Sequence, residues 1–437
     1  MKAPRSGARV KPTAQKRGSK GANNASPRSE GNAVAHEPVE TAGSILRPLH
    51  RCPLLSIQTC SNVDVGGGYG RTIVSQIFFL TSDQERLPRN LEPITHLLTG
   101  ACLGRAGLNR KSALATATLA LAAEAPDVDV VTQFRGPVFG FAHHRGFTHS
   151  FLGTPLVAAL VLGVIYLIWR LRGRKTRNPN LPPRWGLLYL YACLAGLSHL
   201  LLDFTNNYGV RPYWPFSEKW YSWDIVFIVD PILLCVLLLG LLLPGLFALI
   251  NEEIGARSKG PQGRPGATLA LIGVVLVWGV RDYEHRRAAS ALEARQYQGA
   301  DPQRLSAYPH WANPFHWYGV VETESFFSVT RVDSWPPEVD PDAHMHIYYK
   351  PEETPVTLAA KRSYLGRVYL DWAKYPITET EELPDGYRVR FRDLRYEDPD
   401  RERPRPLAAA VELDRNLKVA AESFGWRRQP VRREESK

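Results

Sequence analysis

Long stretches without a charged side chain constrain this chain more than any other feature. Three uncharged runs cover residues 151–169, 185–202 and 231–250, and a shorter one covers residues 265–280. A helix needs about 20 apolar residues to cross the hydrocarbon core of a bilayer, so the first three runs have the length of membrane spans. The fourth reaches that length only if a residue such as Arg281 extends its charge to the interface. A buried helix of a soluble protein explains one such run but not several together, so we predict a multi-pass membrane domain.

The chain has 437 residues, which is enough for more than one domain. Residues 1–90 contain a basic tail rich in Gly, Ser, Ala and Pro, and we predict that they are disordered or a mis-annotated extension, with translation starting at Leu91. Residues 91–285 are predicted to form a mainly α membrane domain. It begins with a short N-terminal helical hairpin at residues 94–125, where small residues such as Gly100 allow close packing, and continues with about four spans.

Residues 286–437 differ sharply in composition from the membrane domain. They are rich in Tyr, Trp, Arg, Glu and Pro, and they contain short alternating stretches at Phe326–Val332, His346–Tyr349 and Tyr387–Phe391. Alternation of this kind is typical of half-buried strands between turns. The predicted fold class is therefore a mainly α membrane domain followed by a β-rich soluble domain.

The net charge of +11 does not indicate a nucleic-acid partner, because the basic residues are concentrated in the N-terminal tail and in the Arg-rich loop at residues 170–184. Cytoplasmic loops carry an excess of Lys and Arg, so we expect this loop to be cytoplasmic. The chain is then a multi-pass membrane protein with an extracytoplasmic C-terminal domain. The expected partners are the lipid bilayer and a lipid-like or phosphoester substrate.

Imidazoles and carboxylates stand at the ends of the predicted spans, where they are costly to bury and usually mark a site. His199 and Asp203 are spaced i and i+4, so on a helix their side chains lie on one face. They either bind one ion together, or Asp203 accepts a hydrogen bond that orients His199. The alternative is that each side chain is hydrogen-bonded separately to solvent or to the backbone. With the topology above, the outer face collects all of the following side chains: His96, Asp127, Asp129, His144, His149, His199 and Asp203.

The side chains on this face are the common ligands of zinc-like metals, and their number leaves room for one or two divalent ions. We predict His96, His144, His149, His199 and Asp203 as metal ligands. Asp127 and Asp129, on an extended segment after Pro126, are predicted to point to the same side as ligand or general base. Arg145 is expected either to bind a phosphate or carboxylate of a substrate or to anchor the helix at the level of the lipid headgroups. Thr148 is expected to cap the helix that follows it. The segment Tyr208–Trp223 is expected to form an aromatic belt at the membrane interface.

These motifs resemble the YdjM-like family of predicted membrane-bound metal-dependent hydrolases, a bacterial inner-membrane group. The matching elements are Pro93-Ile94-Thr95-His96, Pro126-Asp127-Val128-Asp129, His144-Arg145-Gly146 through Thr148-His149-Ser150, and His199 through Asp203. The resemblance covers roughly residues 91–330 and implies metal-dependent hydrolysis, which we expect to act on a membrane-associated ester or phosphoester with zinc as the metal. The alternative is a non-catalytic, metal-stabilised membrane scaffold or partner-binding protein. A transporter is disfavoured, because the middles of runs 151–169 and 231–250 are apolar.

Overall fold

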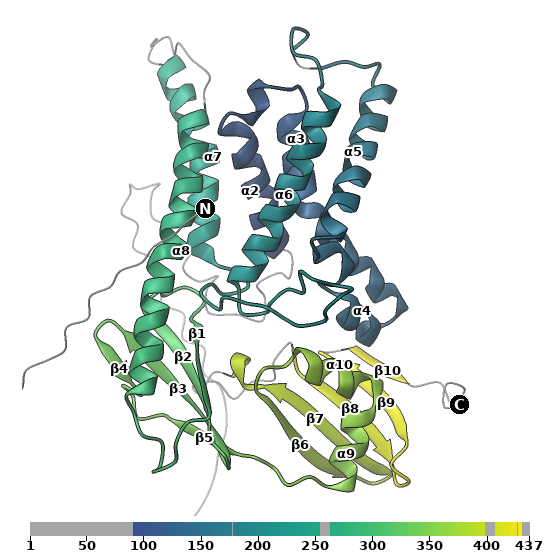
Figure 1. The fold of residues 1–437 in the computed structure, drawn as a ribbon, viewed down its shortest axis with the longest axis vertical. Coiled ribbons are helices and arrows are strands. Elements are labelled where there is room, and N and C mark those ends of the chain that lie inside the picture. The colour runs from purple at the N-terminus through teal and green to yellow at the C-terminus, as the bar shows by residue number, and fades with distance from the viewer. Residues whose placement is uncertain (1–90, 177, 254–262, 398–406, 426, 431–437) are drawn as a thin grey trace, which may run out of the picture. The chain divides into compact units, whose positions relative to one another are not determined.

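The computed structural model describes residues 91–176, 178–253, 263–397, 407–425 and 427–430. The prediction for residues 1–90 therefore lies outside the described residues. Within the described part, helices of the membrane region precede two antiparallel sheets (Figure 1). This order agrees with the predicted fold class.

Four helices are long and apolar enough to cross a membrane: α5 (Gly153–Leu171), α6 (Trp185–Thr205), α7 (Pro231–Glu253) and α8 (Arg264–Glu293). Large apolar side chains cover their outer faces. For example, the exposed fraction is 66% for Leu160 and 64% for both Leu242 and Leu276. Such continuous apolar surfaces are unfavourable in water and favourable in lipid. The four predicted spans are confirmed as helices of that kind.

The predicted hairpin consists of α2 (Leu91–Arg105) and α3 (Ala115–Glu124), joined through the 3₁₀ turn η2 (Leu108–Arg110). Its helices touch at their backbones: a Cβ added to Gly100 would come within 2.8 Å of Ala120 Cα, and one added to Gly104 would come within 2.8 Å of Thr116 Cα. The small residues thus allow the close packing that the sequence predicts.

The helix α8 differs from the prediction at its charged residue. Arg281 does not extend to the interface but is buried, and its Nη2 lies 2.6 Å from Asp230 Oδ2. Asp230 precedes α7 and also accepts hydrogen bonds from Ile232 N and Leu233 N. The helix continues through the predicted boundary at residue 285, because Ala288 and Leu292 join the core of the first sheet.

Three short helical segments connect the hairpin to α5: η3 (Ala125–Arg135), α4 (Pro137–His143) and η4 (Phe147–His149). The segment η3 is a 3₁₀ helix, so the predicted extended conformation of residues 126–129 is wrong. Pro126 stands in its first turn, where the fixed φ of proline favours a helix start. The predicted cap is also wrong: Ser150 Oγ, three residues before Gly153, accepts the Gly153 N–H at 2.9 Å, whereas the Thr148 hydroxyl points to Asp129.

The C-terminal part contains two five-stranded antiparallel sheets. In the first, the order is β1-β2-β3-β4 with β5 also paired to β3, and in the second it is β10-β9-β8-β7-β6. Their strands are β1 (Arg304–Pro309), β2 (His316–Glu322), β3 (Phe326–Ser334), β4 (Pro337–Val339), β5 (His346–Tyr349), β6 (Pro376–Leu383), β7 (Gly386–Asp393), β8 (Ala409–Asp414), β9 (Val419–Phe424) and β10 (Arg427–Pro430). All three stretches predicted as strands lie in strands, namely β3, β5 and β7.

Two helices, α9 (Pro355–Arg362) and α10 (Tyr364–Trp372), lie across one face of the second sheet (Figure 1). Tyr369 and Trp372 of α10 belong to one core cluster with Phe391 and Val411 of the sheet. The same cluster includes Phe141 of α4 and Tyr208, which follows α6. The second sheet therefore shares its core with segments that flank the membrane helices.

Candidate metal centre

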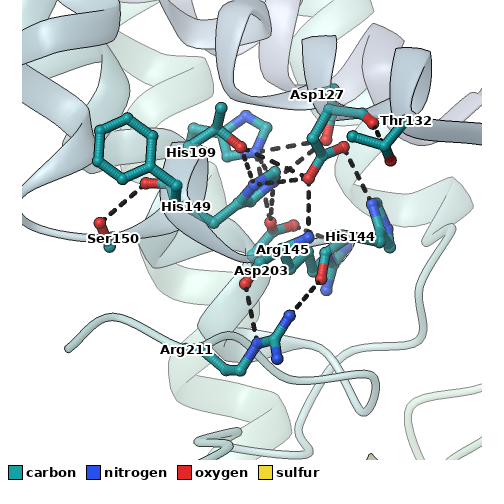
Figure 2. A network of polar contacts seen from close by, with 12 residues as sticks. Asp127, Thr132, His144, Arg145, His149, Ser150, His199, Asp203 and Arg211 are labelled. Atoms are coloured by element: carbon teal, nitrogen blue, oxygen red, sulfur yellow. Dashed lines mark hydrogen bonds and ion pairs between the residues drawn. The ribbon is translucent and has the colours of Figure 1, made fainter. Parts of the chain in front are cut away.

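Five buried or half-buried side chains converge where α2, η3, η4 and the end of α6 meet. They are His96, Asp127, His149, His199 and Asp203. Figure 2 shows the last four with their side chains directed toward one another. The side chain of Asp127 is 21% exposed and the other four are almost fully buried, so Asp127 forms the open corner of the group. This convergence of residues that lie far apart in sequence agrees with the predicted shared face.

The donor atoms are spaced like the ligands of one metal ion. His149 Nε2 and His199 Nε2 are 3.0 Å apart, and Asp203 Oδ2 lies 3.4 Å and 3.3 Å from them. Asp127 Oδ1 lies 3.2 Å from His149 Nε2 and 3.6 Å from His199 Nε2. Ligands that hold a tetrahedral zinc ion at about 2.0–2.2 Å are about 3.3 Å from one another. These donors are therefore placed so that they could hold a metal ion.

The outer nitrogens of the two central imidazoles face protein acceptors. His199 Nδ1 lies 2.6 Å from Ala123 O, so we assign the proton to Nδ1 and the lone pair to Nε2. His149 Nδ1 lies 3.3 Å from Asp129 Oδ2, an arrangement that orients metal-binding histidines and increases their basicity. Two Nε2 atoms 3.0 Å apart repel each other unless a proton or a metal ion lies between them.

His96 extends the group on the side of α2. Its Nε2 lies 3.4 Å from Asp203 Oδ1, and its ring stacks on His199 with centroids 3.8 Å apart. The donors form two sets with ligand spacing, His96/Asp127/His199 and His149/His199/Asp203. Both sets need His199 Nε2, and one imidazole nitrogen binds one ion, so the two sets are alternative positions for a single ion.

Asp129 orients the centre rather than facing it. Its carboxylate accepts the backbone N–H of Arg145 at 2.8 Å and the Thr148 hydroxyl at 3.4 Å, and its Oδ1 lies 3.1 Å from His144 Nδ1. His144, predicted as a ligand, is in neither set of donors, because its Nδ1 is directed to Asp129. Its side chain is 32% exposed, which places it at the accessible edge beside Asp127.

The acidic side chains of η3 stay ionised in this environment. Burial alone would raise the pKa of Asp129, but hydrogen bonds from His144 and His149 outweigh it and hold the pKa well below its usual range. The same opposition holds the pKa of Asp127 low. Burial lowers the pKa of His149, yet its hydrogen bonds to Asp127 and Asp129 outweigh that effect and raise the pKa to about 9. Without a metal, a proton therefore neutralises part of the negative charge at the centre.

Arg145 is buried, in contrast to both predicted roles, each of which needs an accessible side chain. Its Nη2 lies 2.9 Å from Asp203 Oδ1, and its Nη1 donates to Asn206 Oδ1 at 3.2 Å and to Gly209 O at 3.0 Å. The backbone at Arg145 has a φ of 53°, in the left-handed region. The guanidinium thus orients a candidate ligand, Asp203, from inside the protein.

Arg211 also belongs to the surroundings of the centre, although it was not among the residues predicted from the sequence. Its Nη2 donates to His144 O at 3.1 Å (Figure 2). The same nitrogen donates to Ala142 O at 2.9 Å, and the guanidinium lies 4.5 Å from the centre of the Trp220 ring. The predicted aromatic belt is therefore only partly a surface feature: Phe216 is exposed, whereas Tyr208 is buried. An arginine between aromatic residues was the available signal, since such residues often stack.

A small pocket adjoins the centre, with room for about one or two water molecules. His96, Asp203, Asn206 and Asp230 are among its lining residues. The Nδ1 of His96 is buried and has no hydrogen-bond partner among the described residues. The pocket is thus a polar extension of the centre toward the start of α7.

Comparisons with known proteins divide the chain into two matched regions. Residues 91–288 match the YdjM inner membrane protein family, and residues 355–434 match the YfhP C-terminal alpha/beta plait domain. The uncharacterized protein YfhP of Bacillus subtilis (strain 168) is 23% identical over 321 residues, which cover 72% of this chain and 86% of the relative. No solved structure matches the chain. All the candidate ligands lie in the first matched region, which is similar to the YdjM inner membrane protein family.

Proposed function

We propose that this protein is a membrane-bound metal-dependent hydrolase that acts on a membrane-associated ester or phosphoester. The observation that carries the proposal is the set of three buried donors at ligand spacing, from His149, His199 and Asp203, with Asp127 Oδ1 3.2 Å from His149 Nε2. A divalent ion of the zinc type held there would polarise a carbonyl or phosphoryl oxygen and activate a water molecule. Zinc is our proposal for the metal, because imidazole nitrogens and carboxylate oxygens are donors that it prefers.

The surrounding groups keep the donors in place before any ligand binds. Asp129 and Ala123 O hold the outer nitrogens of His149 and His199, while Arg145 holds Asp203. Since these partners fix the rings and the carboxylate, little reorganisation is needed when the centre acts.

His144 is our candidate for proton transfer. Asp129 holds its Nδ1, so Nε2 is the nitrogen that takes a proton from a water molecule or gives one to a leaving group. The imidazole is half-exposed at the edge of the centre, where a substrate would arrive. Asp127, the other partly exposed group, is the alternative base if it does not bind the metal.

The surface beside the centre is apolar. On η3, Val128, Val130 and Val131 are about half exposed and Phe134 is 93% exposed. Phe151, just before the span α5, is also exposed. Large apolar side chains at the start of a membrane helix fit the boundary between headgroups and acyl chains. This surface supports a substrate with a lipid-like tail that stays in the bilayer.

Metal content of the detergent-purified protein tests the proposal. We expect about one equivalent of zinc or a similar ion in the wild type and its loss in His149→Ala/His199→Ala, whereas the control His316→Ala keeps it. In a screen of phospholipids and phosphoesters, His144→Ala should keep the metal and lose about 10²- to 10⁴-fold in rate. A well-folded wild type that takes up no divalent ion after supplementation would disprove the proposal.

The small size of the adjoining pocket favours a second candidate, a metal-stabilised scaffold without catalysis. The scaffold also predicts bound metal, so the screen separates the two candidates. Metal that stabilises the protein, together with no hydrolysis of any ester or phosphoester tested, would favour the scaffold.

A further inference from the structure

The loop that follows α6 connects the candidate metal centre to the C-terminal part of the chain. We call residues 206–211 the 206–211 loop. On the side of the centre, Asn206 Oδ1 accepts from Arg145 Nη1 at 3.2 Å and from Tyr208 N at 2.9 Å, and Gly209 O accepts from Arg145 at 3.0 Å. Through Arg145, this loop supports Asp203, a candidate ligand.

On its other side, side chains of the C-terminal part hold the same loop. Arg395 Nη1 donates to Asn207 O at 2.9 Å, and the Tyr396 hydroxyl donates to the same oxygen at 3.1 Å. Trp372 Nε1 donates to Tyr208 O at 3.2 Å. Asn207 and Tyr208 are buried, so their carbonyl groups would be costly to leave without partners.

A second connection reaches the backbone of His144. Arg211 donates to His144 O at 3.1 Å, and its guanidinium lies against Trp220. The Trp220 ring in turn donates from Nε1 to Asp371 Oδ2 at 3.1 Å, at the end of α10. Two sets of contacts, both through the 206–211 loop, therefore connect the C-terminal part to groups around the centre.

We propose that the C-terminal domain positions the candidate metal centre through the 206–211 loop, with Trp372, Arg395 and Tyr396 as positioning residues. Among the described residues, all the candidate ligands come from residues 96–203, so the described part of the C-terminal domain contributes geometry and no donor atom. When its contacts to the loop are lost, Arg145 and Asp203 are held less firmly and the centre binds metal more weakly. The inference rests on the proposed metal site only for this last effect.

The double variant Trp372→Phe/Tyr396→Phe tests the proposal in the full-length protein. It removes two donors to the loop and keeps two aromatic rings, which stack at 10° in the wild type. Tyr375→Phe is the matched control, because that hydroxyl bonds to Ser306 Oγ at 2.7 Å and not to the loop. Tyr396→Phe alone serves as a milder variant if the double variant does not fold.

Hydrogen exchange of the metal-free protein gives a readout that needs no ion. We expect amides of residues 143–150 and of the 206–211 loop to exchange roughly fivefold to tenfold faster in the double variant, and at wild-type rates in the control. Unchanged exchange in both segments would overturn the proposal.

Titration with Co²⁺ then measures the metal affinity and the visible spectrum of the candidate centre. The double variant should bind cobalt about 10- to 100-fold more weakly and with an altered visible spectrum, whereas the control matches the wild type. Wild-type affinity and spectrum in the double variant would overturn the positioning role while the proposed metal site stands. If the wild type binds no cobalt, the proposed function fails, and hydrogen exchange alone decides whether the domain orders the loop.

Discussion

Asp127 and Asp129 are two residues apart, and the 3₁₀ geometry of η3 directs them differently. Such a helix has about three residues per turn, so side chains at i and i+2 point roughly 120° apart. Asp127 faces the imidazole Nε2 atoms, and Asp129 faces the outer nitrogens of His144 and His149. A single short segment thus supplies one candidate ligand and one orienting carboxylate.

Asp129→Asn tests this division of roles. The amide keeps the size of the side chain but removes its charge and presents a donor to groups that already donate. We expect metal affinity to fall about 10- to 100-fold while the fold is retained. Zinc titration of the purified protein measures the effect, with Asp127→Asn, which loses a ligand atom, as the stronger comparison. Equal affinities of Asp129→Asn and the wild type would contradict the orienting role.

The residue types of the centre are predictable from sequence, whereas their individual roles depend on geometry. His199 and Asp203 are one helical turn apart at the end of an apolar run, which is enough to select them. Arg145 was predicted to contact a substrate or the headgroups, but its partners Asn206 and Gly209, more than sixty residues away along the chain, keep it buried. His144 was predicted as a ligand, but its Nδ1 is directed to Asp129, and that pairing follows from the fold of η3 and not from the motif.

The contact between α2 and α3 depends on the absence of a side chain at Gly100. In Gly100→Ala, the new Cβ would come within 2.8 Å of both Ala120 Cα and Ala123 Cβ. We expect this overpacking to destabilise the protein by about 1–3 kcal/mol. Gly163→Ala in α5 is the control, since no atom lies within 4 Å of its added Cβ, and it should be neutral or stabilising by up to about 1 kcal/mol. Thermal unfolding in detergent compares them, and equal midpoints would refute the close contact.

The buried pair of Asp230 and Arg281 connects the start of α7 to α8. Arg281→Met leaves the Asp230 carboxylate without its charged partner, which we expect to cost about 3–5 kcal/mol. The double variant Asp230→Asn/Arg281→Met removes both charges and keeps an oxygen to accept from Ile232 N and Leu233 N, so it should be clearly more stable than Arg281→Met. Denaturant unfolding in micelles measures both variants. A double variant that is no better would show that the two charges are not coupled.

Hydropathy identifies the membrane helices but not how far they continue. The apolar run of α8 stops at residue 280, yet the helix extends to Glu293 because Leu292 packs against the first sheet. The helix α9 was missed although its start is visible in the sequence: Thr354 and Thr357 form a reciprocal capping box around Pro355. This capping signal was not used, because residues 286–437 were interpreted only from the alternating stretches that are typical of strands.

Orientation in the membrane is a prediction for the whole molecule. The basic loop between α5 and α6 predicts that Arg172 is cytoplasmic and that the C-terminal sheets lie outside. In intact cells, a membrane-impermeant maleimide should label Asn416→Cys, whereas Arg172→Cys should react only after lysis; both positions are exposed. The reverse labelling pattern would place the centre and the sheets on the cytoplasmic side.

The contact between the 206–211 loop and the C-terminal domain could not be predicted from the sequence. Arg395 and Asn207, which form part of it, are 188 residues apart, and neither belongs to a recognisable motif. Burial of Arg395 becomes understandable only once Asp393 and two carbonyl oxygens surround it. Contacts of such long range follow from the complete fold and not from local pattern.

The length of the uninterrupted helix α8 determines how far the first sheet lies from the membrane-spanning part of that helix. At 1.5 Å per residue, its 30 residues extend for about 45 Å, while the hydrocarbon core of a bilayer is about 30 Å thick. Roughly 15 Å of rigid rod is therefore left over at the end that enters the first sheet. Since a helix turns by about 100° per residue, this rod also fixes the direction in which that sheet faces. If α8 spans the bilayer, the first sheet is therefore held at one distance from the lipid surface and in one rotational orientation about the helix axis.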